Sequence, residues 1–350
     1  MLKFWLMEWV VGVLCISATA SAWGLQSDLV NLVPPTAMSG APIEKPESTS
    51  RKNMVASVHP LATQAGVEAF ANGGNAIDAA IATALTLGVV DNFNSGIGGG
   101  CFILIRTANG DVYAIDGREM APAAATQDLF RDAKTRFSNP SQTGPLASGV
   151  PGALKAYARA VAQHGRLDLR ASLNKGIDAA ENGFQVTEAY AAKLRIAKEA
   201  MLQFPGAVNV FFRPDPKTGL LEPYRAGEVL KQSDLADTYR KISEEGTAWF
   251  YQGAFAELTE QWMKANGGIM TAMDFAKYKT VDRKPVRSEY RDFEIYGFPP
   301  PSSGGVHVAQ VLNILEQFEL ADLYQSDRAG FYHVIAEAMK LAFTYRAFSL

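Results

Sequence analysis

The segment from Asn75 to Val90 constrains the fold more than any other stretch of the sequence. Its periodicity predicts a helix that carries isoleucine and leucine on one face and mostly alanine and threonine on the other. A helix that is apolar on nearly every side must be buried by other elements. The chain therefore needs several elements packed around this helix, and its apolar fraction of 48% is enough for such a core.

A β-hairpin is predicted directly after this helix. A glycine loop at 95–100 leads into a strand at 101–107, Asn109-Gly110 forms the turn, and 112–116 is the return strand. Asn-Gly between apolar runs favours a two-residue turn because both positions need positive φ. A phosphate-binding loop follows a strand and opens a helix, whereas this loop leads into a strand. We therefore expect it to serve close backbone packing or the approach of backbone to a substrate.

Most of the remaining chain is predicted to be helical, with short strands at 54–58 and 288–296 and a loop-rich stretch at 204–228. The expected helices span 60–71, 151–164, 170–200 with a break at Asn182-Gly183, 232–245, 253–266 and 329–345, with another directly after Gly305. Many helices, few strands and one antiparallel hairpin favour a layered α+β fold over a doubly wound parallel sheet.

The first residues are typical of a secretion signal. Lys3 supplies a positive start, an apolar run covers 9–16, and Ala20-Ser21-Ala22 fits the small-residue cleavage pattern. The apolar run is shorter than the roughly 20 residues that a membrane span needs. We expect residues 1–22 to be a signal peptide and the protein to be periplasmic or secreted; an uncleaved membrane anchor is the alternative.

The rest of the chain is expected to comprise a leader at 23–53, which prolines interrupt, and one folded domain at 54–350. Without the signal peptide the only cysteine is Cys101, so no internal disulfide can form. Cys101 begins an apolar run, which favours a buried small side chain over a reactive thiol. The net charge of -3 gives no broad attraction to nucleic acid, and we expect no nucleic-acid partner.

No catalytic residue can be identified from motifs in this chain. The sequence contains neither the G-x-S-x-G motif of α/β-hydrolases nor a Walker-type phosphate loop. The four histidines lie far apart and have no metal-ligand spacing. His333 and Glu337 are four residues apart on a predicted helix, and we expect a surface pair there because no third ligand is near. The sequence predicts no catalytic group, no metal and no cofactor.

Arg118 is the candidate for substrate binding. It directly follows the return strand of the hairpin, and a guanidinium at a strand end can bind a carboxylate through two parallel hydrogen bonds. A structural ion pair with Asp116 or Glu119 is the alternative. The residue types alone favour the structural ion pair.

A series of short motifs, taken in order, resembles the large subunit of the gamma-glutamyltranspeptidase family. The motifs are 54–57 (MVAS), 73–80 (GGNAIDAA), 96–100 (GIGGG), 116–122 (DGREMAP), 148–152 (SGVPG), 266–271 (NGGIMT) and 299–305 (PPPSSGG). Each is weakly specific alone, but the ordered set covers nearly all of 54–350. Gly117 stands where family members often carry a larger residue, and Met270 is a second departure; neither replaces a catalytic group.

The resemblance implies an α+β fold that is part of a four-layer αββα N-terminal-nucleophile hydrolase sandwich and lacks the small-subunit strands. One precursor cuts itself, and the new N-terminal threonine of the small subunit becomes the nucleophile, with its own α-amine as base. The activity implied is gamma-glutamyltransferase or glutathione hydrolase. The enzyme would pass the γ-glutamyl group of glutathione and similar donors to water or to amino-acid or peptide acceptors.

The resemblance also gives Arg118 a role, because the family's arginine at this motif position pairs with the α-carboxylate of the glutamyl group. The nucleophilic threonine is not in this chain, which we expect to be truncated at its C-terminal end and inactive alone. One alternative is a non-catalytic fragment, or a partner for a separately encoded small subunit. Another is a sibling such as a γ-polyglutamate depolymerase or a cephalosporin acylase. Arg118 favours a free α-carboxylate on the donor and so argues against the acylase.

Overall fold

The computed structural model describes residues 49–131, 133, 135–137 and 139–349. The expected signal peptide at 1–22 lies outside the described residues, as does most of the expected leader. Among the helices in these ranges, none combines the length and the apolar character that crossing a membrane requires.

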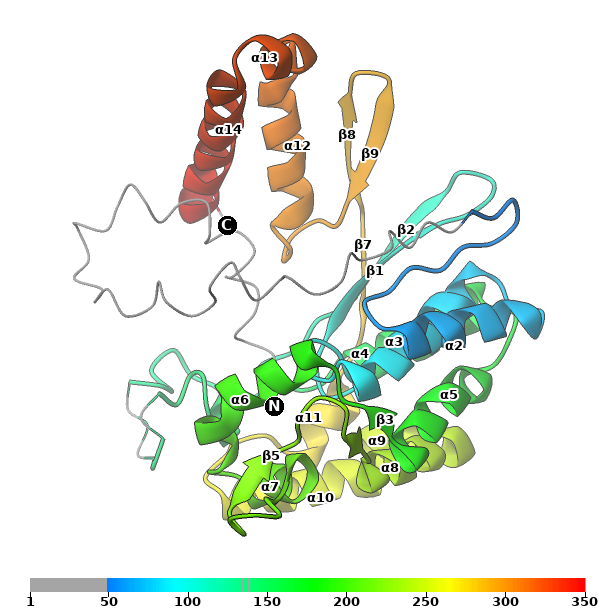
Figure 1. The fold of residues 1–350 in the computed structure, drawn as a ribbon, viewed down its shortest axis with the longest axis vertical. Helices are drawn as coiled ribbons and strands as arrows, with labels where there is room; N and C mark the ends of the chain where they lie inside the picture. Colours follow the sequence, from blue (N-terminus) through cyan, green and yellow to red (C-terminus); the bar gives the residue numbers. More distant parts are fainter. Residues whose placement is uncertain (1–48, 132, 134, 138, 350) are drawn as a thin grey trace.

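A helical layer surrounds α3 (Ala76–Val90), which packs against α2, α4 and α5 (Figure 1). Ile81, Leu85 and Val89 of α3 are all buried, which confirms the prediction of a central helix. The other helices of this layer are α2 (Pro60–Ala71), α4 (Ala153–His164), α5 (Leu169–Asn182), α6 (Glu188–Met201), α7 (Pro205–Phe211), α8 (Ser233–Glu245), α9 (Thr247–Gln252), α10 (Ala254–Ala265) and α11 (Ala272–Lys277).

Asp78 ties the start of α3 to the loop after α4. Its carboxylate accepts a hydrogen bond from the main-chain N–H of Asn75 at 2.8 Å, while the Asn75 side chain accepts from the main-chain N–H of Asp78 at 3.3 Å, which forms a capping box. The same buried carboxylate accepts from the N–H groups of Arg166 at 2.9 Å and Leu167 at 3.2 Å. The charge is therefore buried with its hydrogen bonds satisfied, and the role of this motif is structural.

A three-stranded antiparallel sheet lies beside the helical layer, in the order β1 (Cys101–Arg106), β2 (Val112–Gly117) and β7 (Val281–Arg283) (Figure 1). One face carries Ile103 opposite Ile115 and packs into the core. The other face carries Leu104 and Val281, which are 41% and 44% exposed. The predicted hairpin is therefore confirmed, but its two-residue turn is wrong. Thr107 N–H donates to the carbonyl of Asp111 at 2.9 Å, so the loop has three residues, 108–110, and only Gly110 has a positive φ, of 94°. One side of the sheet is only partly covered.

The C-terminal part consists of a hairpin and three helices, which lie beyond the sheet from the helical layer (Figure 1). Its elements are β8 (Val286–Tyr290), β9 (Phe293–Gly297), α12 (Gly304–Leu315), α13 (Leu320–Ser326) and α14 (Arg328–Ser349). Helix α12 packs against β8, β9 and α14. Both clusters of the hydrophobic core fall between residues 62 and 278. After residue 280, the buried apolar side chains of the described chain are Phe298, Pro299, Leu315, Ala338 and Ala342.

Three local predictions are wrong. The single strand at 288–296 is a hairpin, because Arg291 adopts a φ of 52° and reverses the chain between β8 and β9. The stretch 54–58 is no strand; Val55 packs on the small residues of α2 instead of pairing with another strand. The stretch 204–228 contains α7 and the short strands β4 (Phe212–Pro214) and β5 (Leu221–Pro223).

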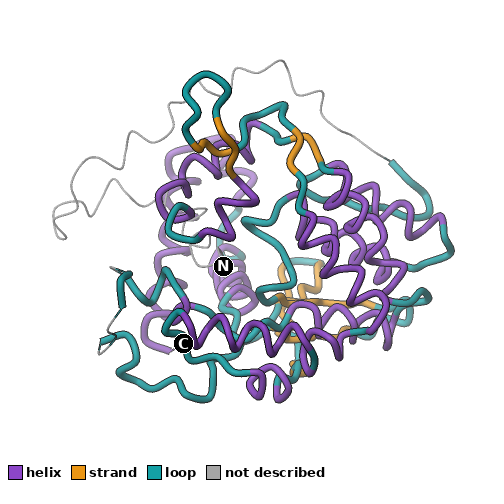
Figure 2. Tube along the Cα trace, turned by 90° about the horizontal axis from the view of Figure 1, so that it is seen from below, coloured by secondary structure: helices purple, strands orange, loops and turns teal. Residues whose placement is uncertain are grey.

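Helices dominate the chain, and the strands form small separate sheets, as the trace in Figure 2 shows. Two further short strands, β3 (Phe184–Gln185) and β6 (Val229–Leu230), form a separate two-stranded antiparallel sheet. The mixed helix-and-strand architecture confirms the predicted α+β class.

Candidate functional site

Arg118 lies directly after β2 and is exposed, and its guanidinium contacts two distant segments. One Nη donates a hydrogen bond to the carbonyl of Pro301 at 3.4 Å. The Cζ atom lies 5.8 Å from the ring centroid of Phe102, which in turn packs on Phe298 with 4.3 Å between ring centroids. The structure thus brings the 116–122 motif against the 299–305 motif. The guanidinium of Arg118 lies between the Phe102 ring on β1 and the loop that contains Pro301.

The structural ion pair considered for Arg118 does not form. The Oδ2 atom of Asp116 accepts from Arg283 instead, from Nε at 3.0 Å and from Nη2 at 2.9 Å. Glu119 turns toward the backbone of Gly100, where its Oε2 lies 2.5 Å from the position of an added Cβ. No carboxylate of the described residues forms an ion pair with the Arg118 guanidinium. The Arg118 side chain is exposed, and its substrate-binding role stays a prediction.

The main chain of Arg118 is fixed from both sides. Its N–H donates to Oδ1 of Asp116 at 2.9 Å, and its carbonyl accepts from the hydroxyl of Tyr278 at 2.8 Å. Burial raises the pKa of Tyr278 above its usual range, and the nearby Asp116 carboxylate raises it further. The hydroxyl therefore stays protonated and remains a donor. Tyr278 also stacks on Tyr251, with 5.9 Å between ring centroids.

Two glycines allow this close approach of sheet, helix and Tyr278. A Cβ atom on Gly117 would lie 2.5 Å from the Cβ of Ala156 and 3.2 Å from the carbonyl oxygen of Gly152. A Cβ on Gly152 would lie 2.0 Å from the Tyr278 hydroxyl. The distances of 2.5 Å and 2.0 Å are too short for any side chain unless the neighbouring atoms move. The departure of Gly117 from the family pattern therefore has a steric cause in this chain, where α4 crosses directly over the end of β2.

The glycine loop at 95–100 belongs to the same cluster of motifs. The carbonyl of Gly99 accepts from the N–H groups of Gly152 and Ala153, each at 2.9 Å, where α4 begins. A Cβ on Gly100 would lie 2.8 Å from the main-chain nitrogen of Glu119. These contacts confirm close backbone packing as one role of the loop. The motifs at 96–100, 116–122 and 148–152 therefore meet around the end of β2.

The other polar candidates of the sequence do not form a site. Within the described ranges, no group of three or more His, Cys, Asp and Glu side chains could hold a metal ion. The expected His333–Glu337 pair is wrong, because Glu337 turns toward the C-terminal end of α14 and binds Lys340 at 3.0 Å. His59 caps α2 through Nδ1, and burial lowers its pKa.

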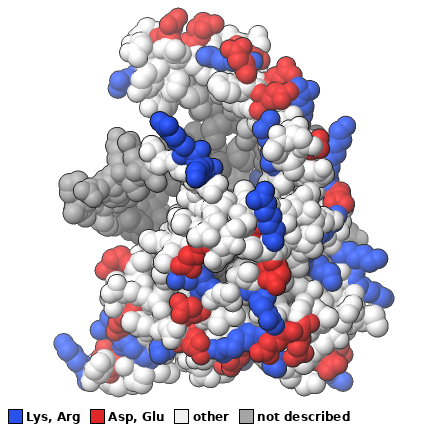
Figure 3. All heavy atoms as spheres, turned by 90° about the vertical axis from the view of Figure 1, so that its right-hand side faces the viewer, with Lys and Arg blue, Asp and Glu red and all other residues white. Residues whose placement is uncertain are grey.

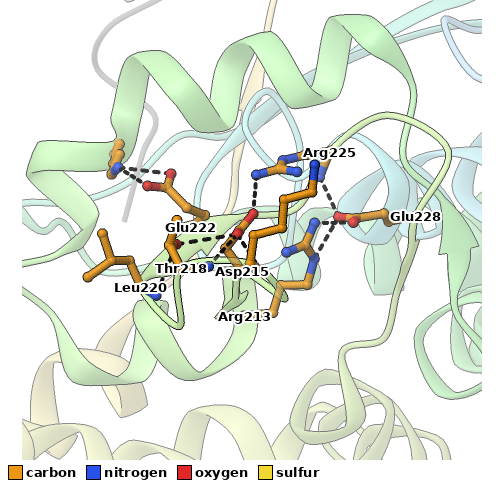
Figure 4. A network of polar contacts seen from close by, with 9 residues as sticks. Arg213, Asp215, Thr218, Leu220, Glu222, Arg225 and Glu228 are labelled. Atoms are coloured by element: carbon orange, nitrogen blue, oxygen red, sulfur yellow. Dashed lines mark hydrogen bonds and ion pairs between the residues drawn. The ribbon is translucent and has the colours of Figure 1, made fainter.

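A polar network on the β4–β5 hairpin is structural as well. Arg213 binds Glu228, and Arg225 binds Asp215 at 2.5 Å (Figure 4). Hydrogen bonds from two main-chain N–H groups in the turn after Asp215, with Arg225 as a smaller contribution, lower the pKa of this carboxyl to about 2. Each of the two cations has its own anion, so the network carries no net charge that would attract a ligand.

An open apolar groove of about 990 Å³ lies between β8, α12 and α14. Its lining is almost entirely apolar or uncharged and includes Val286, Val306, His307, Ile314, Phe318 and Leu341. The Nε2 atom of His307 is buried there and has no hydrogen-bond partner in the described chain. On the face drawn in Figure 3, positive and negative side chains are interspersed, without an extended surface of one sign.

Sequence reasoning found Arg118 but missed the residues that surround it. Arg283 and Tyr278 lie more than a hundred residues further along the chain, and nothing in their local sequence marks them as neighbours of β2. Phe102 reads as one more apolar residue of a strand. The signal that could have found these residues is the motif order itself, because segments shared with one family tend to meet at its site.

Residues 62–350 match the family model described as Gamma-glutamyltranspeptidase. The chain is 39% identical over 300 residues to the glutathione hydrolase proenzyme of Escherichia coli K12, covering 85% of this chain and 50% of that protein. It is 37% identical over 312 residues to the Acylase ACY 1 proenzyme of Pseudomonas sp. V22, covering 87% of this chain and 54% of that protein. The chain therefore spans about half the length of these curated relatives.

The fold is also similar to solved structures. The crystal structure of Helicobacter pylori gamma-glutamyltranspeptidase superimposes with a TM-score of 0.80 at 38% sequence identity. The match covers 86% of this chain and 85% of that chain. At this identity and coverage the likeness extends to both the fold and the sequence.

Proposed function

Because this chain belongs to the gamma-glutamyltranspeptidase family, we propose that it is the large-subunit portion of an enzyme acting on glutathione and related γ-glutamyl compounds. The enzyme hydrolyses or transfers the γ-glutamyl group, with water, amino acids or peptides as acceptors. The threonine nucleophile belongs to the half of the relatives that this chain does not span. The chain alone is inactive in this proposal and completes a four-layer αββα sandwich together with that half.

The position of the Arg118 guanidinium carries the proposal. It stands at the end of β2, has no anionic partner among the described residues, and is held by Pro301 and Phe102. Such a planar cation can bind a carboxylate through two parallel hydrogen bonds. We assign it the α-carboxylate of the γ-glutamyl donor. This contact holds the donor at the end opposite to its reacting γ-carbonyl.

The chemistry assigned to the missing half is acyl transfer in two steps. The threonine hydroxyl attacks the γ-carbonyl carbon, its proton passes to the α-amine and then to the leaving amine, and the C–N bond breaks. The resulting ester is cleaved by water, which releases glutamate, or by an acceptor amine, which forms a new γ-glutamyl amide. Arg118 takes no part in these bond changes. Its contribution is orientation, which lowers the barrier by fixing the donor before reaction.

The incompletely covered apolar surfaces support a two-part protein. Leu104 and Val281 lie on the less covered face of the sheet, and the groove between β8, α12 and α14 is open. Exposed apolar surfaces are often interfaces in a soluble protein. We propose that the polypeptide corresponding to the other half of the relatives covers both surfaces as the small subunit.

Acylase activity is the second candidate, supported by the 37% identity to the Acylase ACY 1 proenzyme. The donor of an acylase need not be a γ-glutamyl compound. A glutaryl donor, for example, has the same chain and the same terminal carboxylate as a γ-glutamyl donor and lacks only the α-amine. Arg118 could bind either donor, so it argues against an acylase only for donors without this carboxylate. The preference between the two donors must then come from groups that recognise the amine.

The test uses the completed enzyme, defined as this chain expressed with the C-terminal half taken from the same genome. We expect glutamate release from glutathione by the completed enzyme and none by the chain alone. A γ-glutamyl anilide should be cleaved faster than the matching glutaryl anilide. A pure, monodisperse completed enzyme without glutamate release would refute the proposed function, and faster cleavage of the glutaryl donor would favour the acylase.

We also propose that residues 1–22 direct export and are removed, that 23–53 form a leader, and that the folded domain covers 54–350. The apolar run at 9–16 and the small residues at 20–22 support the first assignment. The start of α2 at Pro60 and the contact of Val55 with α2 support a domain start near residue 54.

A further inference from the structure

We propose that Arg283 and Asp116 act as a positioning pair that keeps the guanidinium of Arg118 free for the carboxylate of the donor. This inference rests on the proposed function and adds two residues to it. Neither residue touches the donor in this scheme. Arg283 acts on Asp116, and Asp116 acts on the main chain and on the charge environment of Arg118.

The Arg283–Asp116 pair prevents an ion pair between Asp116 and Arg118 that their spacing in the sequence would favour. Asp116 and Arg118 are two residues apart at the end of a strand, and extended backbone places such side chains on the same side. A buried carboxylate next to an exposed guanidinium would normally pair with it, because an uncompensated buried charge is costly. An Arg118 held by Asp116 would have to be released before it could bind a donor.

Arg283 removes this competition. It lies on β7, where Val281 is directly opposite Asp116, so Arg283 is the diagonal neighbour of Asp116 on the same sheet face. Its Nε and Nη2 both bind Oδ2 of Asp116, at 3.0 and 2.9 Å. The buried carboxylate therefore already has a cation. Its charge no longer draws the guanidinium of Arg118 away from solvent.

The second oxygen of Asp116 serves a different purpose. Oδ1 accepts from the main-chain N–H of Arg118 at 2.9 Å, while the Tyr278 hydroxyl binds the carbonyl of the same residue at 2.8 Å. The backbone of Arg118 is thus held on both sides. Only its side chain stays available, leaning on Phe102 and Pro301. The Asp116 carboxylate therefore fixes the backbone of Arg118. Because Arg283 pairs with this carboxylate, the guanidinium of Arg118 has no ion-pair partner in the described chain.

Removal of Arg283 should expose the competition. In Arg283→Gln, Asp116 loses its cation and is expected to capture the guanidinium of Arg118. A donor carboxylate must then displace Asp116, so ligands with this carboxylate should bind more weakly. Ligands without it should be unaffected. A general loss of structure would weaken both kinds of ligand equally, which separates positioning from mere stability.

The experiment measures competitive inhibition of the completed enzyme by L-glutamate and by 4-aminobutyrate, which is glutamate without its α-carboxylate. We expect Arg283→Gln to raise the inhibition constant of L-glutamate by about tenfold or more, the loss typical of one charge-assisted hydrogen bond. The constant of 4-aminobutyrate should stay within about twofold, well inside the uncertainty of such energies. Arg283→Lys, which keeps the cation, should recover part of the L-glutamate affinity.

Arg159→Gln is the matched control. Arg159 of α4 binds Asp282, the residue next to Arg283 on β7, at 2.6 Å. This variant removes an ion pair to the same strand without touching Asp116, so both inhibition constants should stay unchanged. If Arg283→Gln behaves like this control, or weakens both inhibitors equally, the proposal is overturned.

A double variant and a structure complete the test. Asp116→Asn with Arg283→Gln keeps an oxygen for the Arg118 N–H and removes the competing charge, so the L-glutamate affinity should return; failure to return overturns the proposal. A crystal structure of Arg283→Gln should show Arg118 paired with Asp116, and an Arg118 still on Pro301 would contradict it. Absence of turnover in the unaltered completed enzyme would instead refute the proposed function, while the crystal structure would still decide the positioning.

Discussion

The carboxylate of Asp116 accepts a hydrogen bond from the main-chain N–H of Arg118 at 2.9 Å but forms no ion pair with the guanidinium of Arg118. Two oppositely charged residues two positions apart at the end of a strand would be expected to pair through their side chains. They do not, because Arg283 from β7 occupies the other oxygen of Asp116. The arrangement gives Arg118 a fixed backbone and an uncommitted charge, which is what recognition of a soluble carboxylate requires.

Replacement of Arg118 should weaken donors that carry an α-carboxylate. In the completed enzyme, Arg118→Lys loses the two-pronged geometry and Arg118→Ala also loses the charge, which we expect to cost about 2–4 kcal/mol of transition-state binding for Ala and less for Lys. The measurement is kcat/KM on a γ-glutamyl anilide. Arg159→Lys serves as the control. An unchanged kcat/KM in a well-folded Arg118→Ala enzyme would remove Arg118 from the site.

A side chain at position 117 should destabilise the protein. The Cβ of Gly117→Ala would lie 2.5 Å from the Cβ of Ala156, so α4 must shift, and we expect a loss of about 1–3 kcal/mol in the free energy of unfolding. Gly98→Ala is the control, because an added Cβ there meets nothing within 4 Å. Urea unfolding of both variants of the completed enzyme gives the comparison. Equal stability of the two variants would contradict the steric account.

The stability of the protein should fall at alkaline pH. Burial raises the pKa of Tyr157, Tyr190, Tyr239, Tyr251 and Tyr278 above the ordinary value of 10.0. Above that pH the unfolded chain releases these protons while the folded chain retains them, so the folded state binds more protons and the free energy of unfolding decreases as pH rises. Below it, these groups contribute no slope.

Unfolding midpoints measured in urea from pH 8 to pH 11 test this expectation. The variant Tyr278→Phe should show a shallower fall, because one of the titrating groups is gone. It should also be less stable at neutral pH by about 1–3 kcal/mol, since the carbonyl of Arg118 loses its buried donor. A flat profile up to pH 11 would show that these hydroxyls are not buried as described.

The chain alone should be poorly soluble and inactive. Phe293, Val308, Leu341 and Tyr345 are among the large apolar side chains exposed in its C-terminal part, and the groove there is open. We expect residues 23–350, expressed alone, to bind a hydrophobic dye strongly and to release no glutamate from glutathione. Co-expression with the C-terminal half should abolish the dye signal. Glutamate release by a monodisperse sample of the chain alone would mean that it contains an unrecognised nucleophile.

If the protein is exported as proposed, the mature chain should lack residues 1–22. We expect the mature protein to begin at Trp23, because Ala20-Ser21-Ala22 presents small residues at the cleavage position. Mass spectrometry of the intact protein from the producing cells decides this. Recovery of a chain that begins at Met1 from the cytosol would contradict it.

Local signals in the sequence predicted the elements that local physics determines. Helix α2 begins and ends where Pro60 and the Asn72-Gly73 stop indicate. The hairpin of β1 and β2 was also found from Asn109-Gly110, but its loop has three residues, 108–110, because only Gly110 adopts a positive φ. The hairpin at 286–297 was missed because Arg291-Asp292 is a polar pair without a glycine, and its positive φ has no signature in the sequence. The expected pair of His333 and Glu337 failed because Lys340 competes for the same carboxylate.

The candidate site was predictable only in part. Arg118 was found because its motif resembles a family, whereas its neighbours depend on which strand pairs with β2. Nothing in the sequence around β7 says that Arg283 will lie diagonal to Asp116, because that contact joins residues 167 positions apart. Long-range pairing of this kind is decided by the whole core and leaves no periodic trace in either segment.

The span of the core has a consequence for how the chain emerges from the ribosome. Both core clusters are closed by residue 278, so the helical layer has all its apolar partners before β8 is synthesised. Domains fold N-terminal first during synthesis, at about 5–20 residues per second. The helical layer can therefore condense early, with β7 joining the sheet as the next segment to appear. The hairpin and helices from 286 onward are synthesised last, and the apolar groove between β8, α12 and α14 is open when they leave the ribosome. Until this groove is covered, we expect a chaperone to bind this segment rather than the helical layer.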